Sequence, residues 1–420
     1  MNTTALRLYG ERDLRRETFG LPPIADDEIL ARVVTDSICM SSHKAALQGA
    51  RHKRTPDDLA RNPIVIGHEF AGVLLEVGAR WRERFRPGDA FSIQPALSIP
   101  DRELEAPGYS FPFIGGNATR IVIPREVMEQ DCLLPYRGEG FFKASLSEPV
   151  SCIVGAFNTQ YHFKPGTYVH ESGIVAGGAT AILAGAGPMG LGAIDYAIHG
   201  PRRPRLLVVT DADPDRLSRA AELFPPAEAK RHGVELHYLL PQASEPIQQI
   251  LAVNGGSGYD DVFVFAPVAA LIEQASRLLG FNGCLNFFAG PGRPDFFAPV
   301  NFYDIHYSGH HVVGSSGGNT DDMRDALRLM ADGTLNPAVM ITHVGGLDAA
   351  ADAILNLPAL PGSKKLIYNE IAMPLTALAD FRQRGETEPL FAELAEITER
   401  HGGLWSVEAE QRLLAEAERG

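Results

Sequence analysis

The pattern of apolar and polar positions divides the chain into two regions of different character. Up to about residue 149, the apolar runs are short and separated by turns, which is typical of strands in an antiparallel, barrel-like domain. From about residue 151, apolar runs alternate with helical stretches, a pattern that predicts a parallel sheet. The clearest runs are 28–34, 70–77 and 118–123 in the first region, and 181–183, 206–210, 261–265 and 284–288 in the second.

In the last part of the chain, short strands like those of the first region recur and are followed by a helical segment. Residues 321–330 have helical periodicity, and short strands are expected near Ile341 and Leu366. Beyond Pro374 the sequence is rich in Ala, Glu, Leu and Arg, which predicts helices. We therefore expect four segments. Residues 1–155 and 315–373 would form one β-rich domain, residues 156–314 would form a dinucleotide-binding domain, and residues 374–420 would form a helical extension.

Composition narrows the classes of protein to consider. With 45% hydrophobic residues in 420, the chain can bury sizeable cores. Its net charge of -14 argues against nucleic acid or an anionic membrane as a partner. Neither a signal peptide nor a membrane-spanning apolar run is seen, and the four cysteines are far apart, so we expect a cytoplasmic protein without a disulfide framework.

A glycine-rich turn lies between an apolar run and a predicted helix. It reads Gly185-Ala-Gly187-Pro188-Met189-Gly190. In a dinucleotide site the first glycine permits the tight turn, the second lets the backbone approach the pyrophosphate, and the third allows close packing of helix and strand. The helix N-terminus then favours the phosphates. These residues predict the site of a nicotinamide dinucleotide.

An acidic residue follows the turn at the distance that such a site requires. Asp211 ends the next apolar run, 21 residues after Gly190, where a carboxylate accepts hydrogen bonds from the adenosine ribose. It would repel a 2'-phosphate, which favours NAD(H). Arg216 lies close behind it, so NADP(H) stays an alternative.

Potential metal ligands lie near the start of the chain. Cys39 is followed by Ser41, and His68-Glu69 stands before an apolar run. Thiolate, imidazole and carboxylate suit a four-coordinate zinc that keeps one position open. Taken alone, a cysteine in an apolar strand is usually a core residue, and a His-Glu pair is usually a surface feature.

Several short motifs in one order resemble the medium-chain dehydrogenase/reductase superfamily, and in particular its zinc-containing, sorbitol-dehydrogenase-like branch. The resemblance covers about residues 25–370 and implies a GroES-like catalytic domain from both ends of the chain, with a Rossmann domain between them. The motifs are Gly67-His-Glu-Phe-Ala-Gly72 with Gly78 beyond, Phe85-Arg-Pro-Gly-Asp89, Gly115-Gly-Asn-Ala118, Ser147-Glu-Pro149 and the glycine turn.

The resemblance also implies roles for single residues. Cys39, His68 and Glu148 match the catalytic zinc ligands, and Glu69 matches a neighbouring carboxylate that can bind or approach the metal. Ser41 matches the hydroxyl that contacts the substrate alcohol and starts a proton relay. A homo-oligomer, dimer or tetramer, is expected.

The relay would continue from Ser41 through the cofactor ribose to His43 or Lys44. Zinc would hold the substrate oxygen, and hydride would pass between the carbon and the nicotinamide.

Two departures from the family pattern matter. The segment from Gln94 to Gly108 contains no cysteine, so we expect one catalytic zinc and no structural zinc. Ser42 stands where the family commonly has an aspartate that supports the metal. The alternatives are a zinc-free reductase and a non-catalytic dinucleotide-binding protein.

A basic cluster lies between the two metal-ligand motifs. It comprises Arg51-His-Lys-Arg54, with Lys44 before it. Because Arg and Lys bind phosphate, we expect a phosphorylated polyol or ketose as substrate, for example D-glucitol 6-phosphate and L-sorbose 1-phosphate, the pair of the L-sorbose-1-phosphate reductase type that the chain resembles. Lys44, Arg51 and Arg54 are the candidate contacts. The alternatives are a solvated loop paired with Asp57 and Asp58, and an unphosphorylated polyol.

Overall fold

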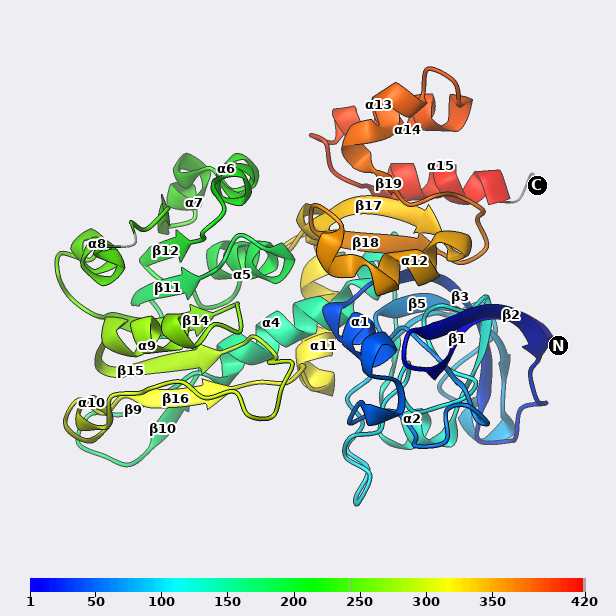
Figure 1. The fold of residues 1–420 in the computed structure, drawn as a ribbon, viewed down its shortest axis with the longest axis horizontal. Helices are drawn as coiled ribbons and strands as arrows, with labels where there is room; N and C mark the ends of the chain where they lie inside the picture. Colours follow the sequence, from blue (N-terminus) through cyan, green and yellow to red (C-terminus); the bar gives the residue numbers. More distant parts are fainter. Residues whose placement is uncertain (243, 418–420) are drawn as a thin grey trace. The chain divides into compact units, whose positions relative to one another are not determined.

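A computed structural model describes residues 1–242 and 244–417, which form two compact units (Figure 1). The first unit consists of Met1–Pro149, Asn319–Ala331 and the chain from Met340 onward. The second consists of Val150–Gly318 and Asp332–Val339. The β-rich domain is therefore built from both ends of the chain around an inserted one, and the insertion includes a short segment, 332–339, that the sequence pattern placed in the return segment.

The first unit is built on an eight-stranded sheet with the order β19-β17-β18-β3-β5-β6-β8 and with β7 also paired to β3. Its central strand β3 is almost wholly buried, as its apolar run predicts. The strands are β3 (Ile29–Ser37), β5 (Phe70–Val77), β6 (Ala90–Ile93), β7 (Arg120–Ile123), β8 (Leu133–Pro135), β17 (Ile341–Gly346), β18 (Lys364–Tyr368) and β19 (Thr376–Ala377).

A second, three-stranded sheet in this unit has the order β2-β1-β4. Its strands are β1 (Asn2–Gly10), β2 (Asp13–Gly20) and β4 (Ile64–Val65).

Close packing of β5 on β3 in the larger sheet explains the glycine that ends the Gly67–Gly72 motif, because a Cβ on Gly72 would lie 1.9 Å from the Arg32 carbonyl oxygen of β3. The helices of the unit are α1 (Met40–Gln48), α2 (Arg125–Glu129), α3 (Phe141–Ser145), the start of α4 (Ser147–Thr159), α11 (Thr320–Ala331) and α12 (Ala350–Leu355).

The second unit contains the parallel sheet that the alternating pattern predicts. Its six strands have the order β13-β12-β11-β14-β15-β16, which is the doubly wound order of dinucleotide-binding domains. They are β11 (Ala179–Leu183), β12 (Leu206–Thr210), β13 (Glu235–Leu239), β14 (Tyr259–Val264), β15 (Leu279–Phe287) and β16 (His311–Gly314), with a hairpin of β9 (Tyr161–Phe163) and β10 (His170–Ser172).

The helices of this unit flank the parallel sheet (Figure 1). A Cβ on Gly190 would lie 2.0 Å from the Gly185 carbonyl oxygen, so the third glycine of the turn is required for the start of α5 to pack against it. The helices are α5 (Pro188–His199), α6 (Pro214–Leu223), α7 (Pro226–Arg231), α8 (Pro246–Val253), α9 (Ala269–Leu278) and α10 (Phe302–Tyr307).

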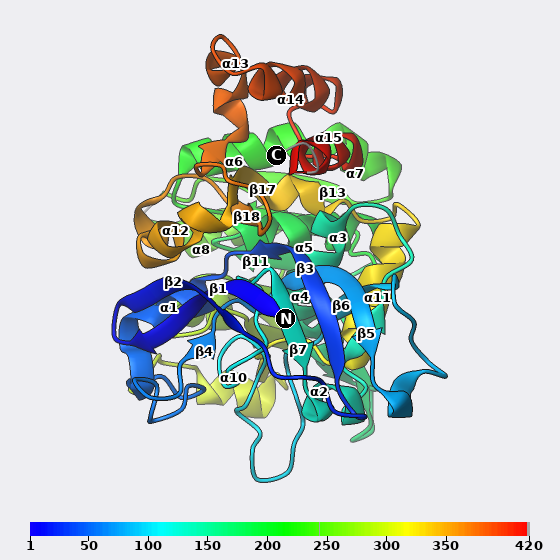
Figure 2. The same ribbon diagram turned by 90° about the vertical axis from the view of Figure 1, so that its right-hand side faces the viewer.

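The segment expected to be purely helical begins with a strand, because β19 pairs antiparallel with β17. Helices α13 (Phe381–Arg384), α14 (Pro389–Arg400) and α15 (Val407–Ala417) follow. In both views α15 lies nearer to β17 and β18 than α13 and α14 do (Figures 1 and 2). Buried Trp405 donates its indole hydrogen bond to the Tyr368 hydroxyl over 2.8 Å. The extension therefore packs on the body of its own unit.

Glu410 of α15 holds the first turn of α3. Its carboxylate accepts hydrogen bonds from the backbone N–H groups of Phe141 and Phe142 over 2.5 and 2.8 Å, and from the Tyr368 hydroxyl over 2.7 Å. Burial raises the pKa of Glu410 from 4.5 to about 7 despite these donors. The folded protein therefore keeps a proton on Glu410 that the unfolded chain releases.

We predict that this residue makes folding stability fall with rising pH. The stability linked to its proton is fully present below pH 4.5 and is lost as the pH rises through about 7. Between pH 5 and 8, the wild type should lose roughly 3 kcal/mol more unfolding free energy than Glu410→Gln, which cannot ionise. Urea denaturation at several pH values measures this, and parallel curves for the two proteins would contradict it.

Candidate active site

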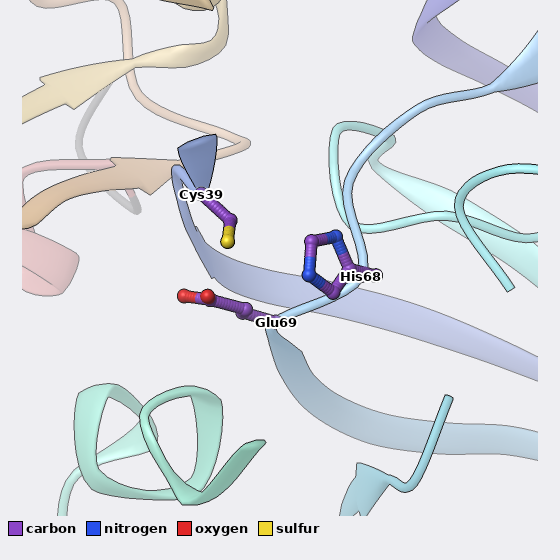
Figure 3. Close-up of side chains that lie close together, drawn as sticks. All are labelled: Cys39, His68 and Glu69. Carbon is purple, nitrogen blue, oxygen red and sulfur yellow. The ribbon is translucent and has the colours of Figure 1, made fainter. Parts of the chain in front are cut away.

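The two metal-ligand motifs leave the sheet at the same end. Cys39 caps the N-terminus of α1 just after β3, and His68 and Glu69 directly precede β5. Strands β3 and β5 are antiparallel partners with Asp36 opposite Phe70, which brings the motifs together. One ligand atom from each of Cys39, His68 and Glu69 lies within 4.8 Å of the others (Figure 3). The donor set of sulfur, imidazole nitrogen and carboxylate oxygen fits a zinc ion.

The His68 imidazole is held in a state that suits a metal ligand. Its Nδ1 lies 3.2 Å from the Ser42 hydroxyl, while Nε2 lies 3.3 Å from the Ser41 hydroxyl, on the side of Cys39. Burial lowers the pKa of His68 to about 4, so the ring is neutral near pH 7. Ser42, where the family commonly has an aspartate, thus orients the ring by a neutral hydrogen bond.

The sulfur of Cys39 lies in a site that disfavours its charge. Burial, with the negative charge of Glu69 as the next cause, raises the pKa of the thiol to about 12. The Ser41 hydroxyl donates a hydrogen bond to the sulfur over 3.0 Å. The charge of Lys364 favours the thiolate less than burial opposes it, and a metal bound beside the sulfur would favour the thiolate further.

Glu69 has a partner that the sequence pattern did not indicate. The Lys364 ammonium group of β18 lies 2.5 and 2.6 Å from the two carboxylate oxygens, and Ser37 donates a further hydrogen bond. Both members of the ion pair are buried, with side-chain exposures of 5% and 1%. Burial is the largest single influence and alone would raise the pKa of Glu69, but the charge of Lys364 and the hydrogen bonds from Lys364 and Ser37 act together against it, and the pKa is lowered. A metal would have to share this carboxylate with Lys364.

Glu148 is buried near the start of α4 but does not belong to the group of three. Its charge raises the pKa of both Cys39 and Lys364, so it lies close enough to act on them. Its role as a further ligand stays a prediction. His43 is buried as well, and its Nδ1 lies 2.7 Å from the Ile354 carbonyl oxygen.

Tyr109, which no pattern in the sequence singled out as a site residue, lies next to Ser41 and His68. It is 4% exposed, and its hydroxyl donates to the Ser41 hydroxyl over 2.8 Å and lies 3.4 Å from His68 Nε2. Burial raises its pKa well above 10, so the hydroxyl keeps its proton. The His52 ring stacks on Tyr109 at 5.6 Å, and the Arg54 guanidinium lies 5.7 Å from its ring centroid.

The structure separates the candidate phosphate contacts. Arg54 reaches the metal-ligand group through Tyr109, and half-buried Lys44 has its pKa lowered by burial. Arg51 instead forms an exposed ion pair with Glu11 over 2.7 Å. The proposed acidic partner Asp58 accepts a hydrogen bond from Asn62. Arg54 and Lys44 therefore lie within reach of residues of the metal-ligand group, whereas Arg51 pairs with Glu11.

A cavity of about 570 Å³ in the second unit contains nearly all the predicted cofactor residues. Gly185 belongs to the same turn but does not line the cavity. Asp211 accepts hydrogen bonds from the backbone N–H groups of Ala186 and Asp213 over 3.0 and 3.1 Å. The cavity is also lined by Thr210, Phe265 and Leu271. The sequence pattern did not identify these three residues as part of the site. The predicted residues that line it are Gly187, Pro188, Met189, Gly190, Asp211 and Arg216.

The sequence of the chain is similar to those of known dehydrogenases. Residues 25–129 match the family model of the alcohol dehydrogenase GroES-like domain, and residues 188–332 match that of the zinc-binding dehydrogenases. L-sorbose 1-phosphate reductase of Klebsiella pneumoniae is 54% identical over 416 residues, 99% of this chain and 98% of that one. Mannitol-1-phosphate 5-dehydrogenase of Aliivibrio fischeri is 49% identical over 98% of this chain and 97% of its own.

A solved structure shares the fold. That of 2R,3R-butanediol dehydrogenase from Bacillus subtilis matches with a TM-score of 0.69 at 19% identity and covers 87% of this chain and 99% of its own. The chain belongs to the zinc-containing medium-chain alcohol and polyol dehydrogenases. Among the described residues, no helix is both long and apolar enough to cross a membrane.

Proposed function

We propose that this dehydrogenase is zinc-dependent and interconverts a phosphorylated hexitol and its ketose phosphate, for example D-glucitol 6-phosphate and L-sorbose 1-phosphate. The observation that carries the proposal is the position of Arg54, which packs on Tyr109 while the Tyr109 hydroxyl reaches Ser41 beside Cys39. A cation joined in this way to the metal-ligand group suits a substrate with an alcohol at one end and a phosphate at the other. L-sorbose 1-phosphate reductase and mannitol-1-phosphate 5-dehydrogenase, which the chain resembles, are both named for phosphorylated substrates.

Cys39 and His68 would hold the zinc, with Glu148 or Glu69 as the third protein ligand. When bound, the metal would polarise the substrate oxygen and lower its pKa. Ser41 would take the proton of the substrate hydroxyl. Because the Ile354 carbonyl oxygen accepts a hydrogen bond from His43 Nδ1, Nε2 is the ring atom through which His43 would take part in the onward relay.

The glycine turn would hold the dinucleotide, which accepts or returns the hydride. We infer that NAD(H) is preferred, because the carboxylate of Asp211 lines the cavity where a 2'-phosphate of NADP(H) would have to be accommodated. Arg216 lines the same cavity and is the residue through which NADP(H) would bind.

The phosphate assignment predicts different effects for two neighbouring arginines. Arg54→Ala should reduce the preference for D-glucitol 6-phosphate (sorbitol 6-phosphate) over sorbitol by about 10- to 100-fold, measured as the ratio of kcat/KM values. The reason is that the change removes a charge-assisted contact. Arg51→Ala, whose side chain pairs with Glu11, is the matched control and should change the ratio less than about two-fold. A wild type that prefers sorbitol, or an Arg54→Ala protein with an unchanged ratio, would contradict the assignment.

We further propose that the protein is a homo-oligomer, dimer or tetramer, whose second copy adds to the open edge of β16. Within the part of the chain that the structure describes, this edge strand pairs with β15 and with no other strand. Large exposed side chains lie on β15, β16 and α10, namely Phe281, Phe302, Tyr303, Tyr307 and Val312. Light scattering should give at least a dimer, and Val312→Lys should lower the mass towards that of one chain. A monomeric wild type would exclude this assembly.

A further inference from the structure

The segment between β6 and β7 lacks the cysteines of a structural zinc, yet it delivers one side chain to the active site. Tyr109 lies in a turn closed by hydrogen bonds from the backbone N–H groups of Tyr109 and Ser110 to the Ala106 carbonyl oxygen, over 3.1 and 3.0 Å. The preceding Gly108 has φ +78°. A Cβ on Gly108 would lie 2.0 Å from the Gly67 carbonyl oxygen, so this turn packs directly against the residue before His68. These contacts place Tyr109 beside the metal-ligand group.

The hydroxyl of Tyr109 determines the direction of the Ser41 proton. Tyr109 donates to the Ser41 oxygen over 2.8 Å, and Ser41 donates to the Cys39 sulfur over 3.0 Å. A hydroxyl has one proton to donate and two lone pairs to accept with. Because Tyr109 occupies one lone pair of Ser41, the Ser41 proton stays directed towards Cys39, and the second lone pair is left to accept the proton of the substrate hydroxyl.

The ring of Tyr109 supports the basic cluster by a separate set of contacts. The His52 ring is nearly parallel to it, with an interplanar angle of 14° and a centroid distance of 5.6 Å. The Arg54 guanidinium lies 5.7 Å from the same centroid. The next residue, Ser110, donates a hydrogen bond to the Arg54 carbonyl oxygen over 2.7 Å. The backbone and the side chain of Arg54 are therefore both fixed by this turn.

We propose that Tyr109 is a positioning residue that sets the spacing between the reacting end of the substrate at Ser41 and its phosphate at Arg54. Its hydroxyl orients Ser41, and its ring places Arg54. The segment that carries a structural zinc in many relatives would here serve substrate selection. The inference rests on the proposed phosphorylated substrate for its second half only, because the contact with Ser41 is independent of any phosphate.

The two halves predict different kinetic changes. Tyr109→Phe removes the hydroxyl and keeps the ring, so kcat should fall about ten-fold for both sorbitol 6-phosphate and sorbitol, with KM and the preference for phosphate nearly unchanged. Tyr109→Leu removes the ring as well, so the preference for phosphate should also fall about ten-fold. Calorimetry should then show about ten-fold weaker binding of sorbitol 6-phosphate to Tyr109→Leu than to Tyr109→Phe, without any turnover.

Tyr136→Phe is the matched control. Tyr136 is a buried tyrosine of the same unit, and its hydroxyl donates one hydrogen bond, over 2.7 Å, to the Glu139 carbonyl oxygen. The Tyr136→Phe protein should lose about as much unfolding free energy as Tyr109→Phe but keep the wild-type kcat. Kinetics of Tyr109→Phe equal to those of Tyr136→Phe would overturn the role of the hydroxyl. Unchanged binding and preference in Tyr109→Leu would overturn the role of the ring.

Failure of the proposed function would look different. In that case the wild type itself would not prefer sorbitol 6-phosphate, while the comparison of kcat on sorbitol between Tyr109→Phe and Tyr136→Phe would still test the orientation of Ser41. The metal content of Tyr109→Phe should equal that of the wild type, because Cys39 and His68 are both retained.

Discussion

Replacing His68 with alanine is expected to remove the bound zinc and to lower kcat/KM by at least about 1000-fold, the largest effect that we predict. The imidazole is buried, neutral near pH 7 and hydrogen-bonded between Ser41 and Ser42, and alanine offers no ligand atom in its place. Elemental analysis should find one zinc per chain in the wild type and a small fraction of that in the variant. Cys39→Ala should behave in the same way.

Binding of the dinucleotide should survive both substitutions. The residues of the glycine turn and Asp211 belong to the second unit, whereas Cys39 and His68 belong to the first. The affinity for NADH, measured by fluorescence titration, should change less than about three-fold. His401→Ala, which changes an exposed histidine of the first unit, is the matched control. Full turnover by a zinc-free His68→Ala protein would contradict the metal assignment.

Replacing Lys364 with alanine is expected to cost about 3–5 kcal/mol of unfolding free energy, because it leaves the buried carboxylate of Glu69 without its cation. A double variant, Lys364→Met with Glu69→Gln, removes both charges and should recover most of the loss. Urea denaturation of all three proteins with a chelator present measures this without a contribution from metal. A single variant as stable as the wild type would show that another group neutralises Glu69.

The parts of this account that were predictable from sequence are those that local patterns encode. The runs 70–77 and 206–210 form strands at those residues, since alternating or continuous apolar residues must be buried in a sheet. The glycine turn was recognisable because each glycine answers a steric need within a few residues, as Gly190 does against Gly185. The fold class and the family followed from the same local motifs.

The contacts that no local pattern encodes come from distant segments. Lys364 is buried against Glu69 only because β18 pairs antiparallel with β3, with Leu366 opposite Ser37, and a lysine in a sequence is ordinarily expected at the surface. Tyr109 lies in an irregular loop, where periodicity does not determine the direction of a side chain. The same limit applies to Arg51 and Arg54, which are three positions apart and point to different partners.

The extension beyond Pro374 illustrates the same limit at larger scale. Its helical composition predicted α14 and α15, but the short strand β19 is formed by two residues that depend on β17 as a partner. Glu410 would be read as a solvated helix residue, yet it binds the backbone of α3 from 268 and 269 positions away.

Turnover of sorbitol 6-phosphate by the purified enzyme, measured with NAD and NADP and with and without a metal chelator, tests the proposed activity. We predict that kcat/KM with NAD exceeds that with NADP, that it exceeds the value for unphosphorylated sorbitol by at least about ten-fold, and that chelation abolishes it until zinc is restored. Turnover that survives complete removal of metal, or that favours sorbitol, would contradict the account.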